Sequence, residues 1–186
     1  MTAFIFQLER IATPIGQMLV VTDDQGRLRA IDWADYETRM LQLMRQQYKG
    51  VSVTLLETQQ ESAATAPMRA YFDGNIAAIE GLEVVTGGTD FQRQVWAELC
   101  TIPHGQTISY GELAVRIGRP KAVRAVGLAN GSNPISVVIP CHRVIGGSGV
   151  LTGYGGGLHR KQWLLEHEHA LPLQRALTHT GQLPGF

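Results

Sequence analysis

Apolar and polar positions near the start of the chain follow the pattern of short β-strands. The runs FIFQLERI, QMLVVTD and RLRAIDW are rich in β-branched and apolar residues, and the turn sequences TPIG and DDQG separate them. Runs of this kind at short spacing predict a three-stranded antiparallel meander. Apolar residues at helical spacing then predict a helix over 35–48, and shorter runs predict a strand over 51–55 and a helix over 66–72.

Helix start signals dominate the later part of the chain. Thr89 with Gln92, and Ser109 with Glu112, match the capping box, in which two side chains satisfy free backbone N–H groups of the first turn. These pairs predict one helix through FQRQVWAEL and another through SYGELAVRIG. The second helix is expected to stop at Gly118, because glycine readily adopts the conformation that ends a helix.

A third helix, KAVRAVGLAN, is predicted after the short connection GRP, with Pro120 in its first turn and its end at Gly131. Two short helices joined in this way, the second carrying Lys121 and Arg124, are typical of a DNA-binding helix-turn-helix, although plain packing units share the pattern. The apolar run ISVVIP then predicts a buried strand leading into CHRVIGG, and LHRKQWLLEHE predicts a last helix. The tail after this helix carries no pattern that we interpret.

The glycine pair before Thr89 marks the expected boundary between an α/β domain over residues 1–88 and a mainly α-helical domain over residues 89–186. The chain is neutral overall, which argues against an indiscriminate polyanion binder. Its halves differ, however: residues 1–88 carry 7 Lys and Arg against 11 Asp and Glu (net −4), and residues 89–186 carry 9 against 5 (net +4). A basic half favours one face for a phosphate backbone, although chance also produces asymmetry of this size.

The two cysteines, Cys100 and Cys141, form neither a disulfide framework nor a paired-cysteine zinc pattern, which favours a reducing compartment. No run approaches the roughly 20 apolar residues of a membrane span, and the first residues lack the pattern of a signal peptide. We therefore expect a cytoplasmic protein that makes no membrane contact and whose thiols are available for chemistry.

Cys141 is the candidate nucleophile. It follows the predicted buried strand and Pro140, and His142 and Arg143 come directly after it. A neighbouring cation or base lowers the pKa of a thiol and so increases the reactive thiolate. The same three letters Pro-Cys-His also fit an inert buried cysteine beside a solvated histidine. Cys100 lacks this setting, and we expect it to be a packed core thiol.

The surrounding sequence narrows this choice. An intact PCHRV motif stands within the stretch RAVGLANGSNPISVVIPCHRVIGGSGVLTGYGGGLHRKQWLLEHE. This stretch strongly resembles the O6-alkylguanine-DNA alkyltransferase family. The resemblance extends to three earlier segments, TDFQRQVWAELCTIPHGQTISYGELA, ATPIGQMLV and YFDGN. It implies a ribonuclease-H-like α/β first domain and a winged helix-turn-helix second domain. It also implies irreversible, single-turnover transfer of an alkyl group from O6 of guanine, with O4-alkylthymine left open, onto Cys141. The base is flipped out of double-stranded DNA first.

The resemblance also implies roles for individual residues. Cys141 would be the nucleophile, His142 and Glu168 a relay that removes its proton through a water, and Tyr110 a proton donor to the departing guanine. Core packing for Tyr110 and solvent exposure for Glu168 are the alternatives. In the DNA-binding set, Arg124 would be the finger that fills the gap left by the flipped nucleotide, although a plain phosphate contact is the ordinary reading of such an arginine. Lys121 and Ser132 complete that set, and the hinge and pocket residues are Asn133, Val144, Tyr154, Gly155 and Gly156.

The resemblance implies a second helix that binds the DNA minor groove, which the small residues of KAVRAVGLAN would permit. Some relatives carry serine in place of Gly155, so a side-chain contact would be lost here. The first half contains no Cys or His, which excludes the zinc site of some relatives; we expect no metal, no cofactor and a monomer in solution, with cooperativity on DNA open. A cysteine hydrolase and a helix-turn-helix binding module without chemistry are the competing functions.

Overall fold

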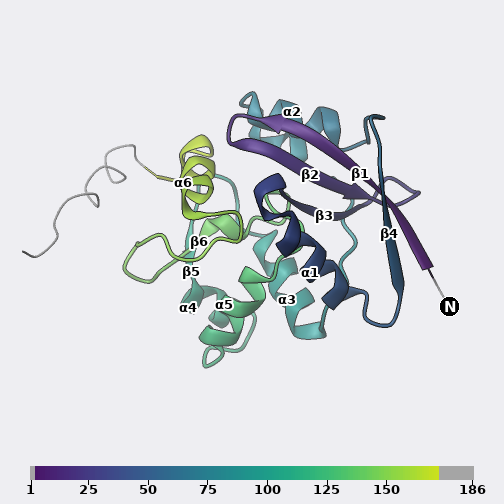
Figure 1. Ribbon diagram of the computed structural model, residues 1–186. Helices are drawn as coiled ribbons and strands as arrows, with labels where there is room; N and C mark the ends of the chain where they lie inside the picture. Colours follow the sequence, from purple (N-terminus) through teal and green to yellow (C-terminus); the bar gives the residue numbers. More distant parts are fainter. Residues whose placement is uncertain (1–2, 172–186) are drawn as a thin grey trace, which may run out of the picture.

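The computed structural model describes residues 3–171 (Figure 1). A four-stranded sheet in the order β3-β2-β1-β4 forms the first half. Its strands are β1 (Ala3–Thr13), β2 (Gly16–Thr22), β3 (Leu28–Trp33) and β4 (Ser52–Glu57). The first three pair antiparallel, which confirms the predicted meander, and β4 pairs parallel with β1.

Both faces of this sheet are covered, because successive side chains along a strand point to opposite faces. Leu19 and Val21 pack with Met40 and Met44 of α1, whereas Met18 and Val20 belong to the core that α2 and the second half of the chain share. The short elements of this half are η1 (Ala34–Tyr36), α1 (Glu37–Gln47), α2 (Thr65–Phe72) and η2 (Ile76–Ile79). The predicted helices and the strand over 51–55 are thereby confirmed.

Helices make up most of the second half. They are α3 (Asp90–Leu99), α4 (Tyr110–Arg116), α5 (Val123–Gly131) and α6 (Leu158–His167), with a 3-10 turn η3 (Cys141–Arg143) and two paired two-residue strands, β5 (Ile108–Ser109) and β6 (Val144–Ile145). One hydrophobic core runs from Ile11 in the first half to Leu164 in α6, so the two halves pack as one body of side chains.

The helix starts follow the sequence signals closely. Thr89 and Gln92 form the full capping box on α3, each accepting a hydrogen bond from the other's backbone N–H. Ser109 accepts from the Glu112 N–H at 3.0 Å, but the Glu112 carboxylate accepts from Arg116 instead of turning back. A capping bond of this kind contributes about 1 kcal/mol.

Three sequence expectations are wrong. The run ISVVIP is not a strand: Ile135 makes an isolated bridge to Ile31, residues 136–138 form a turn, and Val137 takes a positive φ of 73°. An apolar run shows burial but cannot distinguish a strand from a buried turn. Helix α5 begins at Val123, so Pro120 and Lys121 lie in the preceding turn. Cys100 is exposed at the end of α3 and is not a packed core thiol.

None of the helices described over residues 3–171 is long and apolar enough to cross a membrane. The tail that the sequence left without interpretation lies, beyond Leu171, outside the described residues.

Candidate active site

Hydrogen bonds between the Asn133 side chain and the backbone hold the Cys141 segment in place. The Asn133 amide donates to the Ile139 carbonyl at 2.8 Å, and its oxygen accepts from the Ile135 N–H at 3.0 Å. The Cys141 N–H donates to the same Ile139 carbonyl at 2.8 Å. Asn133, only 1% exposed, thus closes the turn that includes the strained Val137. A conformation of this kind costs about 1–3 kcal/mol and persists only where its surroundings hold it.

Helix α5, the second helix of the expected helix-turn-helix, is hydrogen-bonded to the same segment. Asn130, in the last turn of α5, donates through its side chain to the Cys141 carbonyl at 3.4 Å. Cys141 itself is 5% exposed. The structure therefore places the candidate nucleophile directly beneath the end of α5.

Opposing influences act on the pKa of the Cys141 thiol. Burial raises that pKa, while the Asn133 side chain and the positive charges of Lys161 and Arg39 act to lower it. Burial prevails, so the thiol is protonated at rest and needs a base that removes its proton as it reacts.

His142 is suited to that task. Its Nε2 lies 2.9 Å from Glu168 Oε1, and the whole side chain is buried. Burial lowers the pKa of His142 despite the opposing effect of Glu168, so the ring is neutral near pH 7. With Nε2–H donating to the carboxylate, Nδ1 carries the free lone pair, and Nδ1 has no partner among residues 3–171. His142 can therefore accept a proton at Nδ1.

Glu168 is the centre of a buried hydrogen-bond network. Besides His142 it accepts from Arg143 Nε at 2.8 Å, from Arg143 Nη2 at 2.9 Å and from the Tyr71 hydroxyl at 2.8 Å. Burial acts to raise the pKa of Glu168, but His142 and Arg143 outweigh it and hold that pKa far below its ordinary value. The residue ends α6 and is 1% exposed, so the alternative of a solvated helix position is wrong.

Lys161 is buried behind the pocket loop. Its ammonium donates to the carbonyls of Val144 at 2.6 Å, Thr152 at 2.8 Å and Gly153 at 3.3 Å. Burial lowers the pKa of Lys161 to about 8, and interaction with Cys141 acts in the opposite direction. The amine thus fixes the loop and brings positive charge to the thiol.

The expected pocket residues meet in this loop. The Tyr110 hydroxyl donates to the Thr152 carbonyl at 3.3 Å, and burial raises the pKa of Tyr110, so the phenol keeps its proton. Burial also raises the pKa of Tyr154 well above its ordinary value. Val144 is fully buried, and its carbonyl receives the Lys161 bond. These side chains and Cys141 face one small region of the molecule.

Gly155 and Gly156 pack closely against side chains of the first half of the chain. A Cβ atom at Gly155 would overlap the Arg39 guanidinium, and one at Gly156 would overlap the Trp33 indole. Arg39 in turn pairs with the buried carboxylate of Asp32 and donates to the Gly131 carbonyl at 2.8 Å. The first half therefore contacts both the pocket loop and the end of α5, and a serine at Gly155 would displace the Arg39 guanidinium from this position.

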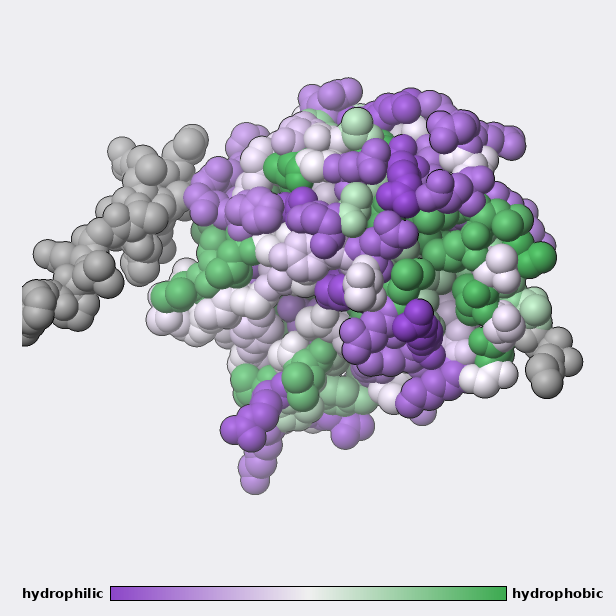
Figure 2. All heavy atoms as spheres, viewed as in Figure 1, coloured by the Kyte–Doolittle hydropathy of each residue, from purple (hydrophilic) through white to green (hydrophobic). Residues whose placement is uncertain are grey.

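The DNA-binding candidates lie at the surface of this site. Lys121 and Arg124 are exposed, and within the described part of the chain neither forms an ion pair. Ser132 ends α5; its hydroxyl donates to the Ala129 carbonyl and accepts from Gln92 Nε2, both at 3.0 Å. Figure 2 shows hydrophobic and hydrophilic atoms mixed over α4 and α5.

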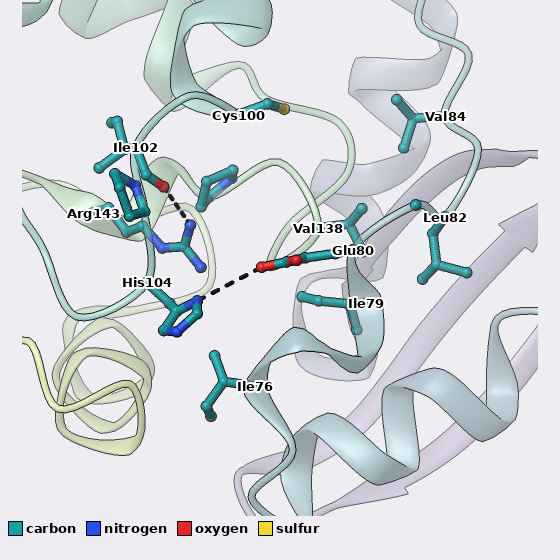
Figure 3. A pocket seen from close by; sticks show the side chains of 13 residues that line it. Ile76, Ile79, Glu80, Leu82, Val84, Cys100, Ile102, His104, Val138 and Arg143 are labelled. Carbon is teal, nitrogen blue, oxygen red and sulfur yellow. Dashed lines mark hydrogen bonds and ion pairs between the residues drawn. The ribbon is translucent and has the colours of Figure 1, made fainter.

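A cavity of about 320 Å³ lies behind the Cys141 segment (Figure 3). Pro140 and Arg143 form part of its wall, and His104 Nδ1 and Glu80 Oε1, 3.6 Å apart, span it from the two halves. Cys141 does not line this cavity, whereas Cys100 does. The space separates the residues around Cys141 from the residues after η2.

Four residues were missed in the sequence reasoning: Tyr71, Lys161, and the pair Asp32 and Arg39. For Lys161 the sequence did contain a signal. Positions 161, 164, 165 and 168 recur at helical spacing and form the buried face at the end of the chain's last described helix. A charged side chain on a buried face needs a hydrogen-bond partner. The others act across long chain separations. Tyr71 bonds to a residue 97 positions away, and Arg39 to one 92 positions away.

Comparison with known proteins identifies the family. A family model described as 6-O-methylguanine DNA methyltransferase, DNA binding domain, matches residues 90–170. A protein of Shigella flexneri named Methylated-DNA--protein-cysteine methyltransferase is 52% identical over 165 residues, covering 89% of this chain and 96% of that protein. This chain belongs to the methylated-DNA--protein-cysteine methyltransferase family. The resemblance carried by the PCHRV motif is confirmed.

Solved structures of family members share the fold. The OGT of Mycobacterium tuberculosis in complex with DNA is 40% identical and superposes with a TM-score of 0.71, covering 88% of this chain and 93% of that one. The O6-methylguanine-DNA methyltransferase of Pyrococcus kodakaraensis is 26% identical, with a TM-score of 0.64 over 88% and 98% of the two chains. Within residues 3–171 no three His, Cys, Asp or Glu side chains gather as metal ligands would.

Proposed function

We propose that this chain repairs alkylated DNA directly, by transferring the alkyl group from O6 of guanine to the sulfur of Cys141. The relatives are named for methylated DNA as substrate and a protein cysteine as acceptor. The observation that carries the proposal within this chain is the buried Cys141 followed by a neutral His142, whose ring Glu168 anchors.

In the proposed reaction the thiol proton passes through a water to His142 Nδ1, and the thiolate attacks the alkyl carbon. The sulfur–carbon bond forms as the carbon–oxygen bond breaks, and the electron pair stays with guanine. Tyr110 donates its proton to the guanine ring, which makes guanine a better leaving group. Glu168 keeps the His142 ring oriented and stabilises its charged form, and Lys161 stabilises the thiolate.

The product is a thioether, which has no carbonyl for water to attack and no good leaving group. Transfer is therefore irreversible, and each molecule acts once. A cysteine hydrolase would instead release several equivalents of product and regenerate its thiol.

DNA recognition belongs to the second half in this proposal. The chain has no Asp or Glu between Glu112 and Glu166, and seven Lys and Arg lie in that interval. Helices α4 and α5 would form a helix-turn-helix with α5 in the minor groove, Lys121 on a phosphate, Ser132 at the backbone and Arg124 as the finger in the stack.

The remaining pocket roles follow the same assignment. Asn133 serves as the hinge between α5 and the active-site turn. Val144, Tyr154, Gly155 and Gly156 wall the space for the flipped base. We also propose a ribonuclease-H-like domain over 1–88, supported by its antiparallel meander with a parallel fourth strand, and a winged helix-turn-helix domain over 89–186. A cytoplasmic monomer that needs neither metal nor cofactor completes the proposal.

Intact-protein mass spectrometry with excess O6-methylguanine duplex tests this function. We expect a mass gain of one CH2 per molecule, a single consumed equivalent, and the modified peptide at Cys141 with Cys100 unchanged. Cys141→Ser should bind the lesion but transfer nothing, because a hydroxyl is a far weaker nucleophile than a thiolate. Turnover beyond one equivalent would favour the hydrolase, and binding without any mass gain would favour the binding module.

A further inference from the structure

Helix α5 exposes a large apolar side chain near the reactive pocket. Leu128 is 73% exposed, more than any other large hydrophobic residue within the described part of the chain. The opposite face of α5 is buried through Val126, Ala129 and Asn130. A single exposed leucine is common on protein surfaces, so the position of Leu128 has to carry the argument.

That position is next to the proposed finger. Leu128 follows Arg124 by four residues, which places the two side chains on one face of α5. Gly127 lies beside them, and a Cβ atom there would come within 3.9 Å of the Tyr110 ring. One turn of α5 therefore presents Arg124 and Leu128 outward while its neighbouring edge borders the pocket.

The charge around α5 indicates which kind of molecule contacts Leu128. Arg119, Lys121 and Arg124 are exposed on the connection before α5 and on α5 itself, and the sequence has no acidic residue between Glu112 and Glu166 to balance them. This surface complements a polyanion and would repel a second copy of itself. A DNA duplex combines this negative backbone with an apolar interior of stacked bases. An exposed leucine on a basic helix matches both features, since an opened base stack offers its side chain an apolar surface away from water.

We propose, resting on the proposed function, that Leu128 is an apolar wedge that enters the base stack beside the lesion and cooperates with Arg124 in keeping the alkylated nucleotide extruded. Leucine is among the side chains that unstack base steps from the minor groove. The leucine methyl groups add apolar contacts to the opened stack, beside those that the Arg124 guanidinium makes with the bases. The wedge thus offsets part of the cost of unstacking the bases.

The test compares repair of an O6-methylguanine duplex with reaction of free O6-benzylguanine. Leu128→Asn keeps the size and branching of the side chain but makes it polar, and the ratio of duplex rate to free-base rate should fall roughly tenfold. Leu128→Met should restore most of the ratio. Val115→Asn is the matched control, because Val115 is 61% exposed on the neighbouring helix α4 and is assigned no contact in the stack.

A second duplex separates a wedge from a general contact. When the lesion lies opposite an abasic site the stack is already weakened, so the Leu128→Asn defect should shrink to within about twofold. A defect of equal size in both duplexes would overturn the wedge. So would a loss of self-association in Leu128→Asn measured by sedimentation, since it would assign the leucine to a second copy of the chain.

Failure of the wedge differs visibly from failure of the proposed function. If the unaltered protein gains no alkyl mass on Cys141 from either substrate, the proposed function is wrong. If it gains that mass and Leu128→Asn repairs the paired duplex at the same relative rate as Leu128→Met, only the wedge is wrong.

Discussion

Replacing Glu168 by Gln should both destabilise the protein and slow its reaction. The carboxylate is 1% exposed and accepts one bond from His142, two from Arg143 and one from Tyr71. A glutamine has only one acceptor oxygen, and its NH2 group would face a hydrogen-bond donor of His142, Arg143 or Tyr71 in place of the second oxygen. It leaves the buried Arg143 guanidinium without its counter-charge, and loss of one partner of a buried pair costs about 3–5 kcal/mol.

The matched control is Tyr71→Phe. It removes one hydrogen bond to the same carboxylate, which costs about 2 kcal/mol, and leaves the Arg143 pair and the His142 bond in place. The ring can keep its edge-on contacts with Phe72 and His167. We expect Glu168→Gln to slow transfer from free O6-benzylguanine roughly a hundred-fold, because the base loses its orientation, and Tyr71→Phe to slow it less than tenfold.

Urea unfolding at several pH values measures the stability difference. The pKa of Glu168 is held below its ordinary value of 4.5, so its contribution is fully present above pH 4.5 and is lost as the carboxylate becomes protonated at lower pH. The stability gap between the unaltered protein and Glu168→Gln should therefore narrow on acidification. A gap that is equal at pH 7 and pH 3, or no larger than that of Tyr71→Phe, would refute the reasoning.

Three further predictions concern other parts of the site. Lys161→Met removes the charge that lowers the pKa of Cys141, so the pH–rate profile with free O6-benzylguanine should move to higher pH; an unmoved profile would contradict this. Asp32→Asn leaves Arg39 without its buried partner and should lower the unfolding free energy, measured in urea, by about 3 kcal/mol. An unchanged unfolding midpoint would show that the Asp32–Arg39 pair does not stabilise the protein. Arg124→Ala should reduce duplex repair far more than reaction with the free base, and equal losses would exclude its role as a finger.

Local sequence signals were sufficient for most of the elements. The meander, the helix starts at Thr89 and Ser109, and the stop after α4 depend on residues close together in the chain, so their patterns are readable without the fold. The PCHRV motif also identified the family before any geometry was known. The turn at residues 136–138 was not readable, because an apolar run records burial and not backbone shape.

The sequence by itself determined the meander and most of the helices, the family and the candidate nucleophile Cys141, since these depend on local patterning and on one contiguous motif. Only the tertiary structure decided how that cysteine is supported: the burial of Lys161, the bond from Tyr71 to Glu168, and the contact of Arg39 with the end of α5. Packing creates these contacts between residues far apart in the chain. The pKa values of buried groups depend on the same packing, because desolvation and nearby charges arise only when the chain has folded.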